Sequence, residues 1–194
     1  MNNTAKCHDD HALDKYLFPF VYSTVMVISI PINCISLYVS CIQVRKKNEL
    51  AVYLFSLSMA DLLYSVILPL WIDYAWNGDN WTLSARLCQF SAFLMYMNFY
   101  TSTALLACIS LDRYLALVHP LKFQHLRTRR ISLIVSIIVW LLEGTVNSVI
   151  LMNKDVFHDP CNSTDHTLCY DKYPLELWQA RLNLFRICSG YLLP

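Results

Sequence analysis

Long apolar stretches constrain this chain more than any other feature of its sequence. Four of them cover about residues 16–44, 50–74, 87–118 and 131–152, and a fifth runs over 179–194. Each of the first four exceeds the roughly 20 residues that an α-helix needs to cross the core of a bilayer. The composition agrees, because 56% of the 194 residues are hydrophobic and only 15% are charged. The sequence therefore predicts an all-α membrane protein, a single domain over 1–194 with a tail of residues 1–15, four helices and part of a fifth.

Charge, glycine content and cysteine spacing argue against several other classes of protein. The formal net charge is +1, so there is no basic surplus and no nucleic-acid partner is expected. Only three glycines are present, and they form no phosphate-binding loop. The eight cysteines include no C-x-x-C pair, which speaks against a zinc site. An intramembrane enzyme or a transporter is the competing class, but the H-E-x-x-H and G-x-S-x-G patterns are absent, so the chain is not expected to be an enzyme.

The charged residues between the stretches predict the orientation in the membrane. The loops after the first and third stretches hold the basic residues Arg45, Lys46, Lys47, Lys122, Arg127, Arg129 and Arg130. The opposite side holds the tail and the acid-rich loops 75–86 and 153–178. Basic loops face the cytosol in most membrane proteins, so the N-terminus is expected outside the cell. The first stretch is too long for a cleaved signal and follows an acidic tail, so we expect it to remain in the membrane.

Three N-x-[ST] sequons check this orientation independently. They lie at Asn2, Asn80 and Asn162, all in segments expected outside the cell. Asparagines in such triplets are glycosylation sites only where they face the secretory lumen, and Asn80 lies close to the expected membrane surface. The sequence thus predicts a glycosylated multi-pass protein of the plasma membrane.

Two acids fall inside the apolar stretches. Asp61 lies in the middle of the second stretch and Glu143 in the fourth. An ionised carboxylate costs about 2.5–3.5 kcal/mol at the centre of a membrane helix, so each acid should face other helices and be paired or protonated. Both are candidates for proton sensing, and the alternative for Glu143 is a protonated acid that simply holds helices together.

Asn98 and Ser102 are four residues apart in the third stretch and therefore share one face of a helix. Their oxygens suit a hard cation. A polar cluster that joins helices through hydrogen bonds is an almost equal alternative.

Four of the six histidines lie in segments expected outside the cell. They are His8, His11, His158 and His166. Histidine changes charge near pH 6.5, within reach of mild acidification. Acids lie beside these histidines, so protonation would create charge-assisted contacts that draw the tail onto the outer loops. Each histidine is a proton-sensing candidate, and a solvated loop residue is the alternative.

The third stretch ends in Asp112-Arg113-Tyr114, followed by His119-Pro120-Leu121. Further motifs are spread over the other stretches and the first outer loop: Asn33, Leu57-Ser58-Met59-Ala60-Asp61, Trp81, Trp140 and Pro194. In these positions the sequence resembles the rhodopsin-like G protein-coupled receptors. The segments TLCYDKYPLELWQ and FLMYMNFY are similar to the proton-sensing subfamily of these receptors. The resemblance implies the N-terminal part of a bundle of seven transmembrane helices.

The resemblance also implies roles for single residues. Asp112, Arg113 and Tyr114 would form the switch that contacts a heterotrimeric G protein, and Asp61, Asn98 and Ser102 would form a sodium pocket. From its position eight residues before Pro194, Arg186 is expected to face the ligand cavity, or else to lie high enough in the fifth helix for its charge to reach the membrane surface. The expected function is a receptor for extracellular protons that raises cAMP through the stimulatory G protein. A lysolipid-responsive receptor is the alternative, and membrane lipids are partners in either case.

The resemblance further implies a disulfide between Cys88 and Cys169, which would hold the long outer loop over the helices. Cys7 and Cys161 also lie outside and can pair with each other, or Cys7 with a cysteine elsewhere. Other than a sodium ion, no cofactor or metal is expected. Because the sixth and seventh helices of the family have no counterpart in these 194 residues, we expect this chain alone not to signal, or to sequester a full receptor.

Overall fold

The computed structural model describes residues 14–125, 127–152, 156–158, 167–169 and 184. Its helices are α1 (Asp14–Arg45), α2 (Leu50–Trp76), α3 (Ala85–Val118) and α4 (Arg129–Met152), and its strands are β1 (Val156–His158) and β2 (Thr167–Cys169). The four predicted membrane helices are therefore confirmed as long apolar helices. Each extends up to two residues beyond the predicted range at one or both ends. The predicted fifth stretch, 179–194, lies outside the described residues except for Leu184.

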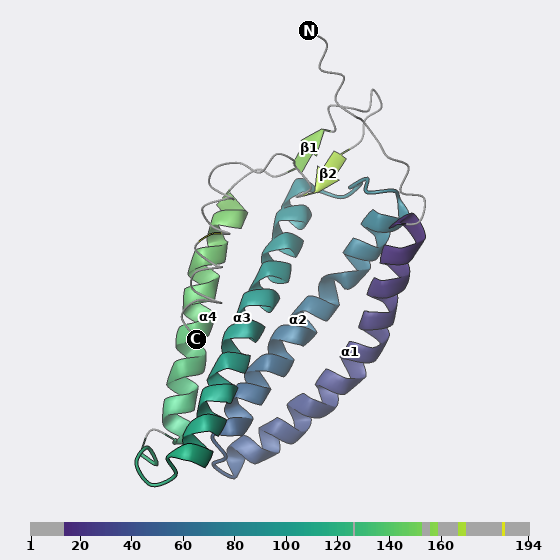
Figure 1. The fold of residues 1–194 in the computed structure, drawn as a ribbon. Helices are drawn as coiled ribbons and strands as arrows, with labels where there is room; N and C mark the ends of the chain where they lie inside the picture. Colours follow the sequence, from purple (N-terminus) through teal and green to yellow (C-terminus); the bar gives the residue numbers. More distant parts are fainter. Residues whose placement is uncertain (1–13, 126, 153–155, 159–166, 170–183, 185–194) are drawn as a thin grey trace.

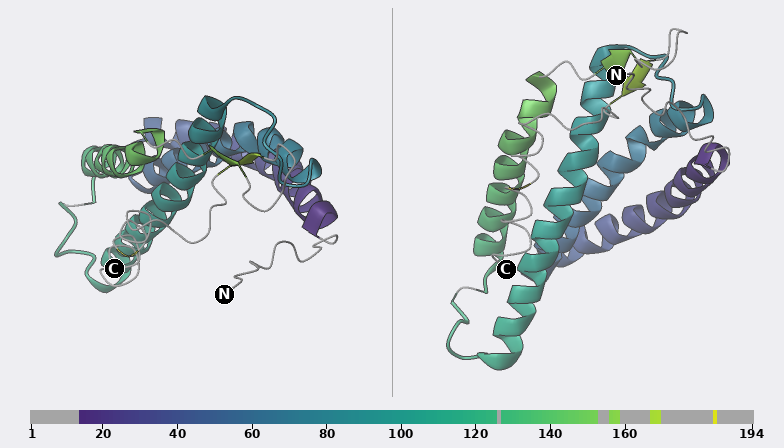
Figure 2. Two further views of the ribbon diagram at one scale, coloured as in Figure 1. Left: turned by 90° about the horizontal axis from the view of Figure 1, so that it is seen from above. Right: turned by 45° about the horizontal axis from the view of Figure 1, so that its top comes forward.

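The helices stand side by side and alternate in direction (Figures 1 and 2). α1 packs on α2, α3 packs on α2 and α4, and α2 also touches α4. One end of the bundle therefore gathers the C-termini of α1 and α3 and the N-termini of α2 and α4. The short antiparallel pair β1–β2 lies at the opposite end, beside the start of α3 (Figure 1). This pair was not predicted, since two strands of three residues leave no recognisable pattern in a long loop.

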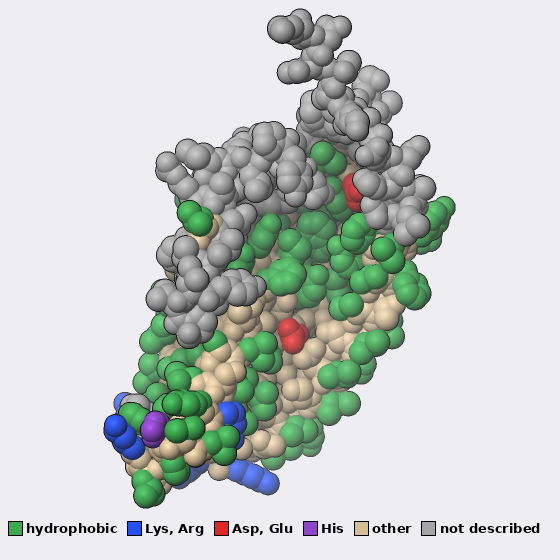
Figure 3. Space-filling model, in the orientation of Figure 1, with side chains coloured by type: hydrophobic (Ala, Val, Ile, Leu, Met, Phe, Trp, Pro, Cys, Tyr) green, Lys and Arg blue, Asp and Glu red, His purple; other side chains and the backbone are tan. Residues whose placement is uncertain are grey.

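The surface of the bundle is apolar, as a bilayer requires. Exposed side chains on α1 include Phe20 at 70% and Ile35 at 65%, and α4 exposes Leu141 at 65%. In water such surface would be unfavourable, but in hydrocarbon it needs no cover. The basic side chains gather at the end of the bundle far from the strands (Figure 3). That separation matches the predicted division between basic and acidic loops.

The turn between α2 and α3 begins with left-handed backbone. Gly78 has φ 67° and Asp79 has φ 60°. Glycine and aspartate tolerate this region better than most residues, so the chain can reverse directly after α2. Ser84 then begins α3 as its N-cap, accepting a hydrogen bond from the backbone N–H of Leu87. The turn between α2 and α3 holds Trp81 against the end of the bundle that carries the strands.

Serine pairs join α1 to α2 within the membrane-spanning part. The Oγ atoms of Ser36 and Ser58 lie 2.6 Å apart, and those of Ser29 and Ser65 lie 3.2 Å apart. Asn33 donates to the Oγ of Ser29 at 2.9 Å. Small polar side chains let two helices approach closely and satisfy each other away from water. These contacts hold α1 against α2, the helix that carries Asp61.

Replacing Ser58 by alanine is expected to weaken the packing of α1 on α2 slightly, because it removes the hydrogen bond to Ser36. A hydrogen bond between membrane helices contributes about 0.6 kcal/mol on average, so the melting temperature should fall by about 1–3 °C. Thermal unfolding in detergent measures the shift. Ser110→Ala is the control, because Ser110 is exposed and its hydroxyl donates only to Leu106 of its own helix. Equal shifts for the two variants would contradict a role for the serine pair.

Candidate functional site

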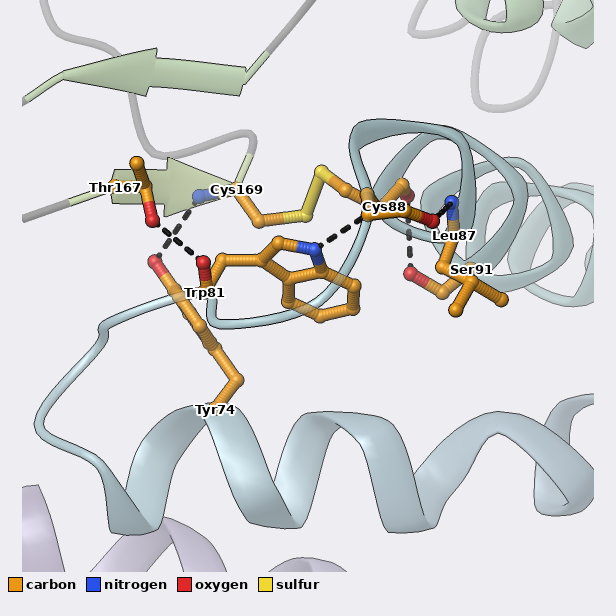
Figure 4. Close-up of a disulfide and its surroundings, with 8 residues drawn as sticks. Tyr74, Trp81, Leu87, Cys88, Ser91, Thr167 and Cys169 are labelled. Atoms are coloured by element: carbon orange, nitrogen blue, oxygen red, sulfur yellow. Dashed lines mark hydrogen bonds between the residues drawn. A yellow bond between two sulfur atoms is a disulfide. The ribbon is translucent and has the colours of Figure 1, made fainter.

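A disulfide fastens the strand pair β1–β2 to the helix bundle, as Figure 4 shows. Cys88 at the start of α3 is bonded to Cys169 in β2, 81 residues further along the chain, and both side chains are fully buried. The backbone N–H of Trp81 donates to the carbonyl of Thr167 at 2.7 Å. The hydroxyl of Tyr74 accepts from the backbone N–H of Cys169 at 3.4 Å. The disulfide is therefore one of several bonds that hold β2 down.

An aromatic cluster packs against the disulfide. Trp71, Tyr74 and Trp81 contact one another, with ring centroids 5.8–6.2 Å apart. All three are buried together with the disulfide. The indole N–H of Trp81 donates to the carbonyl of Ser84 at 3.1 Å. Large aromatic rings bury much area with few rotamers, so this cluster forms a rigid base for the strands.

The strands carry one of the predicted histidines. The backbone of His158 in β1 pairs with that of Thr167 in β2. Thr167 also donates from its backbone N–H to the side-chain oxygen of Asn80 at 3.1 Å. His158 is therefore linked to the turn between α2 and α3 through its backbone partner Thr167, which is bonded to Asn80 in that turn. The same bonds engage Asn80, one of the predicted glycosylation sites, at the base of the strands.

A polar cluster lies between α2 and α3 in the membrane-spanning part. The amide nitrogen of Asn98 donates to Oδ1 of Asp61 at 2.8 Å, and the hydroxyl of Ser102 lies 3.5 Å from the same oxygen. Asn98 and Ser102 are 3.4 Å apart. The structure thus brings together the three residues of the predicted sodium pocket. Within the described part of the chain, no hydrogen-bond donor reaches Oδ2 of Asp61.

The chemistry of this cluster fits a monovalent hard cation. It offers the carboxylate of Asp61 and the hydroxyl oxygen of Ser102, while the amide nitrogen of Asn98 donates to that carboxylate. Oxygen ligands of this kind suit alkali and alkaline-earth ions. A single carboxylate balances one positive charge. Among the described residues, no group of three histidine, cysteine or acidic side chains could hold a metal ion of higher charge.

The second acid of the membrane-spanning part is the half-buried Glu143, which lies at the contact of α4 with α3. Asn147 is fully buried and donates to the backbone carbonyl of Glu143 at 2.8 Å, with one carboxylate oxygen of Glu143 at 3.4 Å. The same amide lies 3.8 Å from the sulfur of Met97 on α3. Asn147 was missed by the sequence reasoning. Its position one helical turn after Glu143 is the signal that could have revealed it.

A charge network joins three elements at the basic end of the bundle. A guanidinium nitrogen of Arg113 lies 2.6 Å from the carboxylate of its neighbour Asp112. Arg127 donates to Asp112 at 3.3 Å and to Glu49 at 2.8 Å. Asp112 is buried, while Arg113 is half exposed. The carboxylate of the predicted switch is therefore shared by two arginines.

Arg127 and Glu49 belong to this charge network, although the sequence reasoning did not single them out. Arg127 was noted only as one of several loop cations, although it links the loop before α4 to α2 and α3. Glu49 is a lone acid two residues after the basic run of Arg45–Lys47, which is the signal that could have revealed it. Tyr114, the third residue of the motif, is 52% exposed, and its ring meets the edge of His119 at 6.0 Å.

Several predicted residues lie outside the described part of the chain. They are Asn2, Cys7, His8, His11, Cys161, Asn162, His166 and Arg186. Their assignments as sensing, disulfide, glycosylation or ligand-cavity residues remain predictions.

The comparisons with known proteins agree with this geometry. The family model described as 7 transmembrane receptor (rhodopsin family) matches residues 32–194. The chain belongs to this family of receptors, and it is therefore a multi-pass membrane protein and not an enzyme.

Among individual proteins, the chain is 58% identical to G-protein coupled receptor 65 of Homo sapiens over 196 residues, which cover all of this chain and 58% of that receptor. It is 39% identical to G-protein coupled receptor 68 of Homo sapiens, covering all of this chain and 52% of that receptor. It is 32% identical to lysophosphatidic acid receptor 6 of Mus musculus, covering all of this chain and 56% of that receptor. The chain thus spans somewhat more than half the length of these relatives.

Proposed function

We propose that this chain is the N-terminal part of a G protein-coupled receptor that responds to extracellular protons. The proposal places the N-terminus and β1–β2 outside the cell and the basic end of the bundle in the cytosol. It further assigns the stimulatory G protein as partner, with a rise in cAMP as the output. Similarity to G-protein coupled receptors 65 and 68 supports the receptor part of the proposal.

The observation that carries proton sensing is the attachment of the outer strands. His158 lies in β1, and His166 directly precedes the strand that Cys169, Thr167 and their partners fix to α2 and α3. Protonation of histidines in these segments adds positive charge as the pH falls through about 6.5. Because β2 is bonded to both helices, a change in the contacts of the strands bears directly on the bundle.

The polar groups along α2 and α3 provide a physical route toward the cytosolic end. Asp61 and its partners lie between the outer cluster and the motif at Asp112, on the same two helices. A sodium ion held at Asp61 would favour one packing of α2 on α3, and a proton on the carboxylate would remove the charge that attracts the ion. Arg113 would then exchange its partner Asp112 for the G protein.

The experiment measures cAMP while the outer pH is lowered from about 7.8 to about 6.4, across the titration range of histidine. It uses this chain joined to the remaining part of human G-protein coupled receptor 65, beside the 194 residues alone. We expect a rise in cAMP from the joined protein and none from the chain alone, because the G-protein cavity requires a movable sixth helix. No response from a joined protein that reaches the cell surface would contradict proton sensing.

Replacing His8, His11, His158 and His166 together by asparagine is expected to shift the half-activating pH of the joined protein by at least about 0.5 units toward acid. Asparagine keeps the polarity but cannot gain a proton. The cAMP titration measures the shift. His125→Asn is the matched control, since His125 is exposed at the opposite end of the bundle. An unchanged titration in the fourfold variant would contradict sensing by these histidines.

A lysolipid receptor is the second candidate, and one cavity favours it. The outer ends of α1 and α2 enclose about 230 Å³, lined by Phe18, Tyr22, Trp71, Tyr74, Ala75 and Asp79. Aromatic rings and polar groups share its walls, and such a mixed lining suits an amphipathic ligand. Similarity to lysophosphatidic acid receptor 6 points the same way. A cAMP or calcium response to lysophosphatidic acid at constant pH, without a response to acid, would favour this candidate.

A further inference from the structure

The turn after α2 contains an asparagine followed directly by glycine, Asn77–Gly78, and the sequence holds no second pair of this kind. Asn77 is the C-cap of α2, and its side chain is exposed. Gly78 has φ 67°, and apart from its chain neighbours no atom lies within 4 Å of the position that a Cβ would take. Water therefore has access to the side-chain amide of Asn77 and to the backbone that follows it.

The end of α2 explains why a glycine stands at this position. The backbone N–H of Gly78 donates to the carbonyl of Ala75 at 3.2 Å, and that of Asp79 donates to the carbonyl of Tyr74 at 3.1 Å. These two bonds form a Schellman motif, in which the residue after the C-cap adopts the left-handed conformation and is usually glycine. The cap of α2 thus selects the same glycine that completes the Asn-Gly pair.

An Asn-Gly pair can react with water without an enzyme. The backbone nitrogen of Gly78 attacks Cγ of Asn77 and closes a five-membered ring, while the side-chain nitrogen leaves as ammonia and carries away the proton of the Gly78 N–H. Water then opens this cyclic imide at one of its two carbonyls. Opening at the main-chain carbonyl gives isoaspartate, and opening at Cγ gives aspartate. One water is consumed and one ammonia released, with no change of oxidation state.

The cap of α2 slows this reaction. Asn77 has ψ 13°, so its main chain must rotate to bring the nitrogen of Gly78 onto Cγ. That rotation breaks the bonds from Gly78 to Ala75 and from Asp79 to Tyr74. The final turn of a helix opens more readily than its interior, and the net contribution of each backbone bond is small. The cap therefore delays the attack and does not prevent it.

We propose that Asn77 is a site of spontaneous deamidation, at which water converts the side-chain amide into isoaspartate or aspartate when the cap of α2 opens. Either product adds a negative charge between Asp73 and Asp79, which are both exposed. The charge lies at the C-terminal end of α2, where the helix dipole disfavours it. Isoaspartate also inserts one carbon into the backbone that leads to Trp81.

The test follows the conversion in the full chain, held in nanodiscs in heavy-oxygen water at mildly alkaline pH. Mass spectrometry of its peptides detects the heavy oxygen and separates aspartate from isoaspartate. We expect both products at Asn77. Asn48 is the internal control, because it is also exposed in a turn but is followed by Glu49. It should convert at least about tenfold more slowly, since a side chain on the next residue hinders the attacking nitrogen. Equal conversion at the two asparagines would overturn the proposal.

A synthetic peptide of residues 73–82 measures the effect of the cap. It lacks the stable helix end, so its asparagine should convert about tenfold faster than Asn77 in the full chain. Equal rates in the peptide and the chain would overturn the role of the two cap bonds.

Gly78→Asn tests the role of the glycine. Asparagine tolerates the left-handed conformation better than most residues, so the cap is retained, but its side chain hinders the attack. Conversion at Asn77 should slow by at least about tenfold. Thermal unfolding checks that the variant is folded. Conversion at the parent rate or faster would overturn the assignment of this pair as the reactive one.

Asn77→Asp reproduces the charge of the aspartate product. Its melting temperature should be about 1–3 °C below that of the parent, because the new charge faces the negative end of the helix dipole and lies near Asp73 and Asp79. Asn77→Gln keeps the amide without the charge and is the matched control. Equal melting temperatures of the two variants would overturn the predicted effect of the charge. None of these measurements involves a response to acid or a G protein, so their outcome is separate from that of the proposed function.

Discussion

Replacing Cys169 by serine is expected to remove most of the protein from the cell surface. The disulfide to Cys88 closes a loop of 81 residues, and such a link stabilises a fold by about 4.5 kcal/mol in the chain-entropy description. Its loss also leaves a serine hydroxyl in a fully buried position above Trp71 and Trp81. The backbone bonds of Thr167 and Cys169 to the turn and to Tyr74 are too few to hold β2 alone. Flow cytometry with an N-terminal epitope tag measures the loss.

Cys34→Ser is the matched control for this variant. Cys34 is a free, exposed cysteine on α1, so its replacement should leave surface display within about 20% of the parent, in the range of neutral surface changes. Surface display of Cys169→Ser equal to that of Cys34→Ser would show that the aromatic cluster and the backbone bonds suffice. In that case the disulfide would be dispensable for the outer end of the bundle.

Replacing Asp61 by asparagine is expected to abolish a specific stabilisation by sodium. Asparagine keeps an oxygen that can accept from Asn98 at 2.8 Å but lacks the charge that attracts a cation. The parent should melt at a higher temperature in sodium chloride than in choline chloride, with a gain of about 2.7 kcal/mol when sodium is at 100 times its dissociation constant. That gain corresponds to about 5–10 °C for a chain of this size. Thermal unfolding in the two salts measures it.

Asp73→Asn provides the control for charge on the same helix. Asp73 is exposed and lies three turns beyond Asp61, so its replacement should leave the difference between the two salts intact. Asp61→Ala should in addition lower stability in both salts by about 1–3 kcal/mol, because it leaves the donor of Asn98 without its acceptor. A parent protein that melts at the same temperature in both salts would contradict the sodium pocket.

The sequence was most informative for apolar runs and for the polar residues within them, because a membrane restricts both to few structural roles. Runs of apolar residues predicted four helices that the structure confirms, because backbone in hydrocarbon must satisfy its own hydrogen bonds. Asp61 and Asn98 stood out for the same reason, since a polar side chain in such a run needs a partner. Helix spacing placed Asn98 with Ser102, but it gave no distance to Asp61 on another helix.

The contacts across elements could not be read from the chain. The pairing of β1 with β2 joins two strands of only three residues each, and their stability depends on contacts with Trp81 and Cys88. The bridge from Arg127 to Glu49 joins residues 78 positions apart. Exposed loop cations look alike in a sequence, because charge alone does not say which of them meets a carboxylate.

The sequence by itself determined which segments enter the membrane, which end of the bundle carries the basic residues and which family the chain resembles. These properties depend on the type of each residue and on the spacing of apolar residues within one helix, so no contact between helices is needed to predict them. Tertiary structure alone decided that two arginines share Asp112 and that Lys47 meets Arg129 and Arg130 around one cavity. The physical reason is distance: electrostatic and hydrogen-bond energies depend on separations of a few ångströms, and only the packing of α2, α3 and α4 sets those separations.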